Sequence, residues 1–261
     1  MISIKQKKIG ILIISRTSSK RLKNKAKLKI NNLSILEILV TRLLKLKSFA
    51  NLILCSSKTN NDKNFYKDIS KKYGIKFFFG DEKNVLKRII ECSNKFNLKH
   101  VVRVTGDNPL TDLRLIKLLC KRHIINNNDY TFSESLPRGM RAEIFSLSGM
   151  RRNYSQILDL RSTEYLTYYF KRPEMYKIEN LKLKKINKNQ HLQSISIDSL
   201  KDFRLLEKLL NKVSVHNLTR KKIISFLKKN VIIQKKKRIS LVTNKYDVRY
   251  KQDVLLKRKF L

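Results

Sequence analysis

The sequence predicts an α/β protein whose central sheet is mostly parallel and is flanked by helices. Apolar, strand-like runs alternate with amphipathic helical segments as far as residue 125, and this alternation favours a parallel, doubly wound sheet. The first run, residues 9–15 (I-G-I-L-I-I-S), is continuously apolar up to its last residue, which is typical of a central strand covered on both faces. Hydrophobic residues make up 41% of the 261 residues, enough for a sizeable core.

Each element of this first half has its own signal. Short runs of β-branched and other apolar residues predict strands, at residues 9–15, 52–55, 75–79 and 101–104. Apolar residues at helical spacing predict the intervening helices, over residues 36–44, 65–73, 85–96 and 113–120. Because parallel crossovers are right-handed, the loops after the first and fourth strands should lie at the same edge of the sheet.

Beyond residue 128 the alternation breaks down. Strands are expected at residues 142–146, 178–183 and 194–198, and helices at residues 162–170 and 203–213. The tail from residue 229 is rich in lysine and arginine, and no Gly/Ser linker precedes it. We therefore expect one unit over residues 1–228, divided into halves at about residue 125, followed by a basic extension over residues 229–261.

The chain is strongly basic, with 60 Lys and Arg against 20 Asp and Glu, a formal net charge of +40. Such a surplus is compatible with nucleic-acid binding. It also accompanies the abundant Lys, Ile and Asn that coding DNA rich in A and T produces. The basic residues are spread along the whole chain, which favours the second explanation, so nucleic acid is not an expected partner. The surplus would still help to attract polyphosphate ligands.

The cysteines and the hydropathy pattern indicate a cytoplasmic protein. Cys55, Cys92 and Cys120 lie far apart in apolar segments and show no metal-binding spacing, so we expect buried free thiols in a reducing compartment. The apolar run at residues 9–14 is shorter than the ~20 residues that span a bilayer. It lacks a small-residue cleavage site as well, so neither a signal peptide nor a membrane anchor is expected.

A ligand-binding crevice is predicted where the first and fourth strands end, since ligands of open α/β sheets bind at that edge. The loop after the first strand contains Arg16, Arg21 and Lys25 together with Ser18 and Ser19. Cations, hydroxyls and successive backbone N–H groups suit a polyphosphate. Three cations in ten residues are equally compatible with a solvated loop in so basic a chain.

Asp107 is the clearest candidate for chemistry, because it follows the fourth strand in a chain where acids are scarce. Mg²⁺ takes one or two protein carboxylates and completes its shell with water and substrate phosphates. Asp107 is therefore predicted to hold Mg²⁺, and Asp198 is the best second ligand. The alternatives are a turn residue that bonds its own backbone for Asp107 and a helix N-cap for Asp198.

Weaker candidates lie nearby. Arg103 projects from an apolar strand and either reaches the crevice or pairs with an acid. Arg138, which precedes Gly139, either lines an acceptor site or forms a turn. His100 and His123 are expected at the surface or at a helix end.

Several segments, taken in chain order, resemble one family. Its opening motif R-x-x-S-x-R-L-P-x-K is matched by Arg16, Ser19, Arg21, Leu22 and Lys25. Its V-R-I-T-G-D-C-P-L, P-R-G-L-D-V-E-V-F and V-D-T-P-E-D-F segments are similar to residues 102–110, 137–145 and 197–203. The chain thus resembles the cytidylyltransferases that make CMP-activated acidic sugars, and the nearest branch is the spore-coat polysaccharide biosynthesis protein F group. Arg141 and Tyr165 replace the Asp and His of the family pattern.

The resemblance implies a Rossmann-like nucleotide-diphospho-sugar transferase fold and a Mg²⁺-dependent transfer of CMP from CTP to a sugar. Pyrophosphate is the second product, and the sugar would serve surface polysaccharide biosynthesis. The expected catalytic residues are Arg16, Lys25 and Asp107. The expected nucleotide-binding residues are Ser15, Arg16, Ser19, Arg21, Lys25, Arg103 and Asp107. The expected sugar-binding residues are Arg138, Glu143 and Glu164, and the expected metal ligands are Asp107 and Asp198.

By the same resemblance, residues 1–125 form the nucleotide-binding half and residues 126–228 the acceptor half. The expected partners are CTP and a small sugar acceptor, with a homodimer as a candidate assembly. Two alternatives belong to other classes. One is a nucleic-acid-binding protein on a retired enzyme fold. The other is a glycosyltransferase of the GT-A type, which the absence of an Asp-x-Asp motif disfavours.

Overall fold

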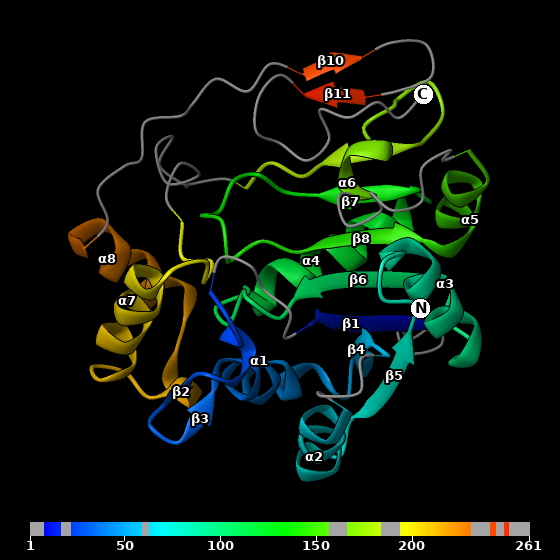
Figure 1. Ribbon diagram of the computed structural model, residues 1–261. Coiled ribbons are helices and arrows are strands. Elements are labelled where there is room, and N and C mark those ends of the chain that lie inside the picture. Colours follow the sequence, from blue (N-terminus) through cyan, green and yellow to red (C-terminus); the bar gives the residue numbers. More distant parts are fainter. Residues whose placement is uncertain are drawn as a thin grey trace.

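A computed structural model gives the structure of the protein, and the residues it describes are 8–16, 22–58, 63–156, 166–183, 194–230, 241–243 and 248–250. A seven-stranded sheet forms its centre (Figure 1), in the order β5-β4-β1-β6-β8-β7-β9. The strands of the first half are β1 (Ile9–Ser15), β4 (Asn51–Ser57), β5 (Lys76–Gly80) and β6 (His100–Thr105). Those of the second half are β7 (Tyr130–Phe132), β8 (Glu143–Ser146) and β9 (Ile178–Asn180).

The central strand β1 is where the chain reverses its progress across the sheet. It pairs in parallel with β4 on one side and β6 on the other, so that Ile11 lies opposite both Leu52 and Val102. The chain runs outward from β1 through β4 to β5 and then returns to β6. β8 is antiparallel to its neighbours β6 and β7, while β9 is parallel to β7. The predicted mostly parallel sheet is confirmed, and a topological switch point lies between β1 and β6.

Helices cover both faces of the sheet, because successive side chains of β1 enter two different hydrophobic clusters. Ile11 and Ile13 belong to the first cluster and Leu12 and Ile14 to the second, and none of the four is more than 9% exposed. The first cluster includes α1 (Ile35–Leu43), α2 (Lys63–Tyr73), α4 (Leu113–Ile125), α7 (Leu200–Leu210) and α8 (Arg220–Asn230). The second includes α3 (Val85–Lys95), α5 (Leu147–Gln156) and part of α6 (Leu166–Tyr169). The expected flanked, doubly wound architecture is confirmed.

The second half departs from its predicted elements more than the first. Residues 194–198 do not form a strand, and only Ser194 makes an isolated bridge, to Arg138. The helix expected at residues 203–213 begins earlier, at Leu200, because the Ser199 side chain accepts a hydrogen bond from the Asp202 backbone N–H and so caps it. Of the helix expected at residues 162–170, residues 162–165 lie outside the described residues.

Several smaller elements were not anticipated. A hairpin of β2 (Lys29–Ile30) and β3 (Leu33–Ser34) turns through Asn31 and Asn32, whose φ angles of 49° and 65° lie in the left-handed region that asparagine tolerates. In the tail, β10 (Leu241–Thr243) pairs with β11 (Val248–Tyr250). The boundary expected at residue 228 falls inside α8 and stays a prediction.

The cysteines follow the prediction: Cys55, Cys92 and Cys120 are all buried and free. Over the residues that the structure describes, no helix combines the length and the apolar character needed to cross a membrane.

Candidate active site

The site lies at the switch point, where the ends of β1 and β6 approach each other closely. Gly106 follows β6 and packs against Ser15, the last residue of β1. A Cβ atom on Gly106 would lie 2.6 Å from Ser15 Oγ and 2.7 Å from Ser15 Cβ, so only glycine fits there. The next residue, Asp107, is thereby placed at the edge of the sheet beside the end of β1.

A segment from the second half of the chain, residues 194–198, runs along the same edge. The backbone N–H of Ile195 donates to the carbonyl of Arg138 over 2.9 Å, and that of Ile197 donates to the carbonyl of Asp107 over 2.9 Å. These two hydrogen bonds place Asp198 beside the end of β6, where Asp107 lies. They join residues far apart in the sequence, which explains why the sequence alone did not place them.

Gly139 permits this close passage. Its φ of +87° lies in the region that favours glycine. A Cβ on it would meet the backbone of the crossing segment, 2.5 Å from Ser196 N. Beyond the crossing, Ser199 and not Asp198 provides the side-chain cap of α7. The N-cap alternative for Asp198 is therefore wrong.

One ammonium group joins the two carboxylates. Lys25 Nζ donates to Asp107 Oδ2 over 2.7 Å, to the carbonyl of Ile197 over 2.9 Å and to Asp198 Oδ1 over 3.1 Å. The side chains of Lys25, Asp107 and Asp198 are 11%, 23% and 25% exposed. The structure thus brings together three of the predicted site residues.

The ionisation of Asp107 follows from these contacts. Burial disfavours its charged form, but the charge and hydrogen bond of Lys25, with a further hydrogen bond from Thr105, outweigh burial and hold the pKa of this carboxyl below its usual value. Asp107 is therefore an anion at neutral pH, as a metal ligand must be.

The oxygen atoms around Lys25 Nζ suit a hard divalent cation. Two carboxylates and a backbone carbonyl converge on one positively charged atom, and Mg²⁺ prefers oxygen ligands with one or two carboxylates among them. No cluster of three or more His, Cys, Asp or Glu occurs within the described ranges, so substrate phosphates and water would complete the shell. The residues present fit Mg²⁺, with Asp107 and Asp198 as its protein ligands.

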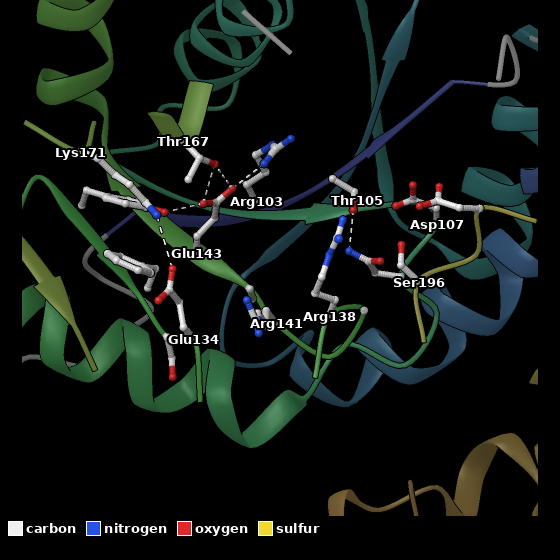
Figure 2. A pocket seen from close by; sticks show the side chains of 17 residues that line it. Arg103, Thr105, Asp107, Glu134, Arg138, Arg141, Glu143, Thr167, Lys171 and Ser196 are labelled. Carbon is white, nitrogen blue, oxygen red and sulfur yellow. Dashed lines mark hydrogen bonds and ion pairs between the residues drawn. The ribbon is translucent and has the colours of Figure 1, made fainter. Parts of the chain in front are cut away.

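A cavity of about 430 Å³ opens beside this cluster, a volume in the usual range for small-molecule sites. Figure 2 shows Asp107 and Ser196 at one end, Glu134 and Lys171 at the other, and Arg103 with Glu143 between them. The segment 133–142 supplies six of the lining residues, and β6, β7, β8 and the segment 194–198 supply most of the others. Arg138 and Glu143, both predicted to bind the sugar, line this cavity.

Glu143 is the centre of a hydrogen-bond network in the cavity wall. Its carboxylate accepts from Arg103 Nη1, from Tyr130 Oη over 2.7 Å and from Thr167 Oγ1 over 2.9 and 3.1 Å. Arg103 thus pairs with an acid and lines the cavity as well. Because both oxygens of Glu143 are engaged by neighbouring side chains, the network fixes the shape of the wall.

Two further arginines give the cavity a basic character. Arg138 is exposed on its rim. Arg141 is partly buried and donates from Nε to the carbonyl of Leu136 over 2.6 Å. Burial lowers the pKa of the Arg141 guanidinium, and the nearby Arg138 charge adds to that effect, opposed only by Glu134. The guanidinium still remains charged near neutral pH.

The structure describes only some of the residues that were predicted to bind the nucleotide. Arg16 follows β1 directly and is exposed. Ser15 is buried, and its Oγ lies 3.2 Å from Tyr66 Oη, so its hydroxyl is engaged within the protein. Ser19, Arg21 and Glu164 lie outside the described residues, and their roles stay predictions.

Sequence reasoning missed Thr105, Tyr130, Thr167 and Lys171, all of which line the cavity. For Thr105 a signal existed: it stands two residues from both Arg103 and Asp107, and alternate residues of a strand share a face. Tyr130 and Lys171 lie outside the predicted elements, so no local pattern pointed to them. Thr167 lies in the helix predicted over residues 162–170, whose described part is helical over Leu166–Tyr169, but it was not assigned to the site.

The fold and the position of the site at the strand ends identify this chain as an α/β protein with the nucleotidyltransferase fold. A cytidylyltransferase from Leptospira borgpetersenii serovar Hardjo-bovis superposes with a TM-score of 0.79 at 26% identity, covering 88% of this chain and 98% of that one. A CMP:2-keto-3-deoxy-manno-octonic acid synthetase, solved with CTP, superposes with a TM-score of 0.60 over 78% and 99%. At 13% identity, that second likeness shows the fold alone.

The sequence comparisons identify the family to which the chain belongs within this fold class. Residues 10–239 match the family model described as cytidylyltransferase. An uncharacterized protein of Methanocaldococcus jannaschii is 34% identical over 223 residues, or 85% of this chain and 90% of its own length. The spore coat polysaccharide biosynthesis protein SpsF of Bacillus subtilis is 25% identical over 234 residues, 85% and 95% of the two chains. This chain belongs to the cytidylyltransferase family, as its motifs predicted.

Proposed function

We propose that the protein transfers CMP from CTP to a sugar, giving a CMP-sugar and pyrophosphate in a Mg²⁺-dependent reaction. A hydroxyl oxygen of the sugar attacks the α-phosphorus, the bond from that phosphorus to the bridging oxygen of the β-phosphate breaks, and the hydroxyl proton is released. The observation that carries the proposal is the Asp107–Lys25–Asp198 cluster at the switch point, directly beside the acceptor cavity.

The side chains of the site would act by position and charge. Asp107 and Asp198 would hold Mg²⁺, which supplies neutralisation of the phosphate oxygens when it is bound. Arg16, at the end of β1, would contact the triphosphate and stabilise the leaving pyrophosphate. Positioning and charge stabilisation suffice for a direct displacement, so the mechanism needs no protein nucleophile.

The charges of the cavity support an acidic sugar. Glu143 is paired with Arg103 and Glu134 with Lys171, while Arg138 and Arg141 add two guanidinium groups to the same walls. Guanidinium groups bind carboxylates in a bidentate manner. We therefore propose a carboxylated sugar, and the similarity to a Bacillus protein of spore-coat polysaccharide biosynthesis supports a role in surface polysaccharide synthesis. The three buried thiols fit the cytoplasm as the compartment.

The test is pyrophosphate release from CTP and a panel of carboxylated and neutral sugars with Mg²⁺. We expect release with CTP and at least one carboxylated sugar, and none without the sugar. Asp107→Asn should lower turnover by roughly 10²–10³-fold, the usual cost of losing one charge-stabilising group. Asp68→Asn removes an exposed carboxylate from α2 and should leave turnover unchanged. A folded wild-type protein that releases no pyrophosphate with any nucleotide and sugar would overturn the proposal.

A further inference from the structure

The hydrogen-bonding capacity of Lys25 is fully used inside the protein. An ammonium group has three N–H donors, and Lys25 Nζ makes three hydrogen bonds, to Asp107, to Ile197 and to Asp198. Its side chain is only 11% exposed. Lys25 can therefore donate to a triphosphate only after it has released at least one of these acceptors.

The acceptors that Lys25 occupies are the proposed metal ligands. Asp107 Oδ2 and Asp198 Oδ1 are both directed at its ammonium. A divalent cation that enters this site meets carboxylates whose negative charge is already compensated by a tethered cation. The tethered ammonium and the metal ion therefore compete for the same two side chains.

We propose that Lys25 is the resident counter-ion of the Asp107–Asp198 pair and is displaced from it when the metal and the nucleotide bind. This inference rests on the proposed function, because it uses the same metal site and the same triphosphate. The triphosphate gives the displaced ammonium a new anionic partner, so binding of the metal and binding of CTP favour each other. A divalent ion alone lacks that compensation and binds weakly.

The carboxylate pair should stay assembled without Lys25. The backbone bond from Ile197 N–H to the Asp107 carbonyl, at 2.9 Å, joins the two strand-end segments independently of any side chain. The backbone N–H of Asp198 also donates to Asp202 Oδ2 over 3.0 Å, which fixes Asp198 to the start of α7. Removing the ammonium would then leave two anionic ligands side by side, without the lysine that competes with a metal ion for them.

The experiment is a titration of the full chain with Mn²⁺ in the absence of nucleotide. Electron paramagnetic resonance measures the concentration of the free ion at each step. Lys25→Gln should bind Mn²⁺ at least tenfold more tightly than the wild type. Lys23→Gln removes the same charge from an exposed position of the same loop and should stay within twofold of the wild type. Lys25→Met, which keeps an unbranched stem, serves as the second variant should Lys25→Gln fold poorly, with thermal unfolding as the check.

Two outcomes of this experiment distinguish a failure of the counter-ion role from a failure of the metal site itself. The counter-ion role is overturned if the Lys25 variants bind Mn²⁺ no more tightly than the wild type while Asp107→Asn in the Lys25→Gln background weakens binding. If Asp107→Asn has no effect in any background, Mn²⁺ does not bind at the carboxylate pair. That outcome overturns the metal site on which the proposed function depends, together with this inference.

Discussion

The cavity wall and the strand-end cluster hold their charges in different ways. In the wall, each acid has its own basic partner: Glu143 pairs with Arg103, with side chains 12% and 15% exposed. At the strand ends, the ammonium of Lys25 forms ion pairs with two acids, Asp107 and Asp198. A dedicated pair keeps its geometry when a ligand enters, whereas a shared cation can be exchanged for another one. The comparison indicates that the ion pairs of the wall maintain the shape of the cavity, whereas the cation bound by Asp107 and Asp198 can be exchanged for another.

The largest effect should come from separating the two carboxylates without altering either. In Gly139→Ala the new Cβ would lie 2.5–2.8 Å from the backbone of residues 195 and 196, so the segment that carries Asp198 must shift. Displacements of about 1 Å at an active site can cost ~10²-fold in rate. We expect at least that loss in the rate of pyrophosphate release.

Gly74→Ala is the matched control for this prediction. Gly74 also has a positive φ, +56°, but ends α2 and meets only Lys47 Nζ, at 3.3 Å. This variant should lose some stability and keep its activity. Full activity in Gly139→Ala would show that the placement of Asp198 does not matter.

The second prediction concerns the ion pair between Glu143 and Arg103 in the cavity wall. Glu143→Ala leaves Arg103 without its carboxylate in a nearly buried position, and breaking such a pair typically costs about 3–5 kcal/mol. Glu134→Ala removes the partner of Lys171 at a site where Glu134 is 51% exposed, and exposed pairs are worth about 0–1 kcal/mol. Urea unfolding of the two variants measures the difference, and equal losses would contradict the distinction between a structural wall and its rim.

The third prediction concerns the opposite end of β6, where no ligand is expected. His123 is fully buried; its Nδ1 lies 3.0 Å from Thr131 Oγ1 and its Nε2 lies 3.2 Å from His100 Nδ1. His123 lies in the last turn of α4, so of the two expected positions, at the surface or at a helix end, it takes the second. Burial, reinforced by His100 and only partly opposed by Asp129 and Glu179, lowers the pKa of His123 to about 3.

Because this pKa lies below that of the unfolded chain, the unfolded state binds the extra proton first as the pH falls. The stability that His123 contributes is fully present above about pH 6.5 and is lost toward pH 3. Between pH 7 and pH 5 we expect a loss of about 2 kcal/mol in the free energy of unfolding from this residue. Urea unfolding of the wild type and of His123→Gln at both pH values isolates the effect, and identical pH dependence of the two would refute it.

The sequence predicted the first half well because its signals are local. Ile9–Ser15 reads as a covered strand from its own composition, and the helix that ends at Tyr73 is recognisable from the spacing of Phe65, Ile69 and Tyr73. The second half depends on long-range contacts. The strand of Tyr130 has no distinctive pattern of its own, and it forms by pairing with β8 and β9.

The residues of the candidate site could likewise be predicted where the signal is local, but their contacts with one another could not. Asp107 was identified from its position after the fourth predicted strand, and Lys25 from a motif in the loop after the first. That Lys25 bonds both Asp107 and Asp198 required knowledge of where residues 194–198 cross the sheet. The partners of Glu143 were equally inaccessible, since Arg103, Tyr130 and Thr167 come from three different elements.

The sequence by itself thus determined the class of fold, the family and the residue types available at the strand ends, because periodicity and motifs are properties of neighbouring residues. The tertiary structure decided which acids share a cation, which acid is held by its own arginine, and which histidine is removed from water. Those outcomes depend on distances between residues that are remote in the chain. They are set by strand order, by close passages such as the one at Gly139, and by the burial that follows from packing.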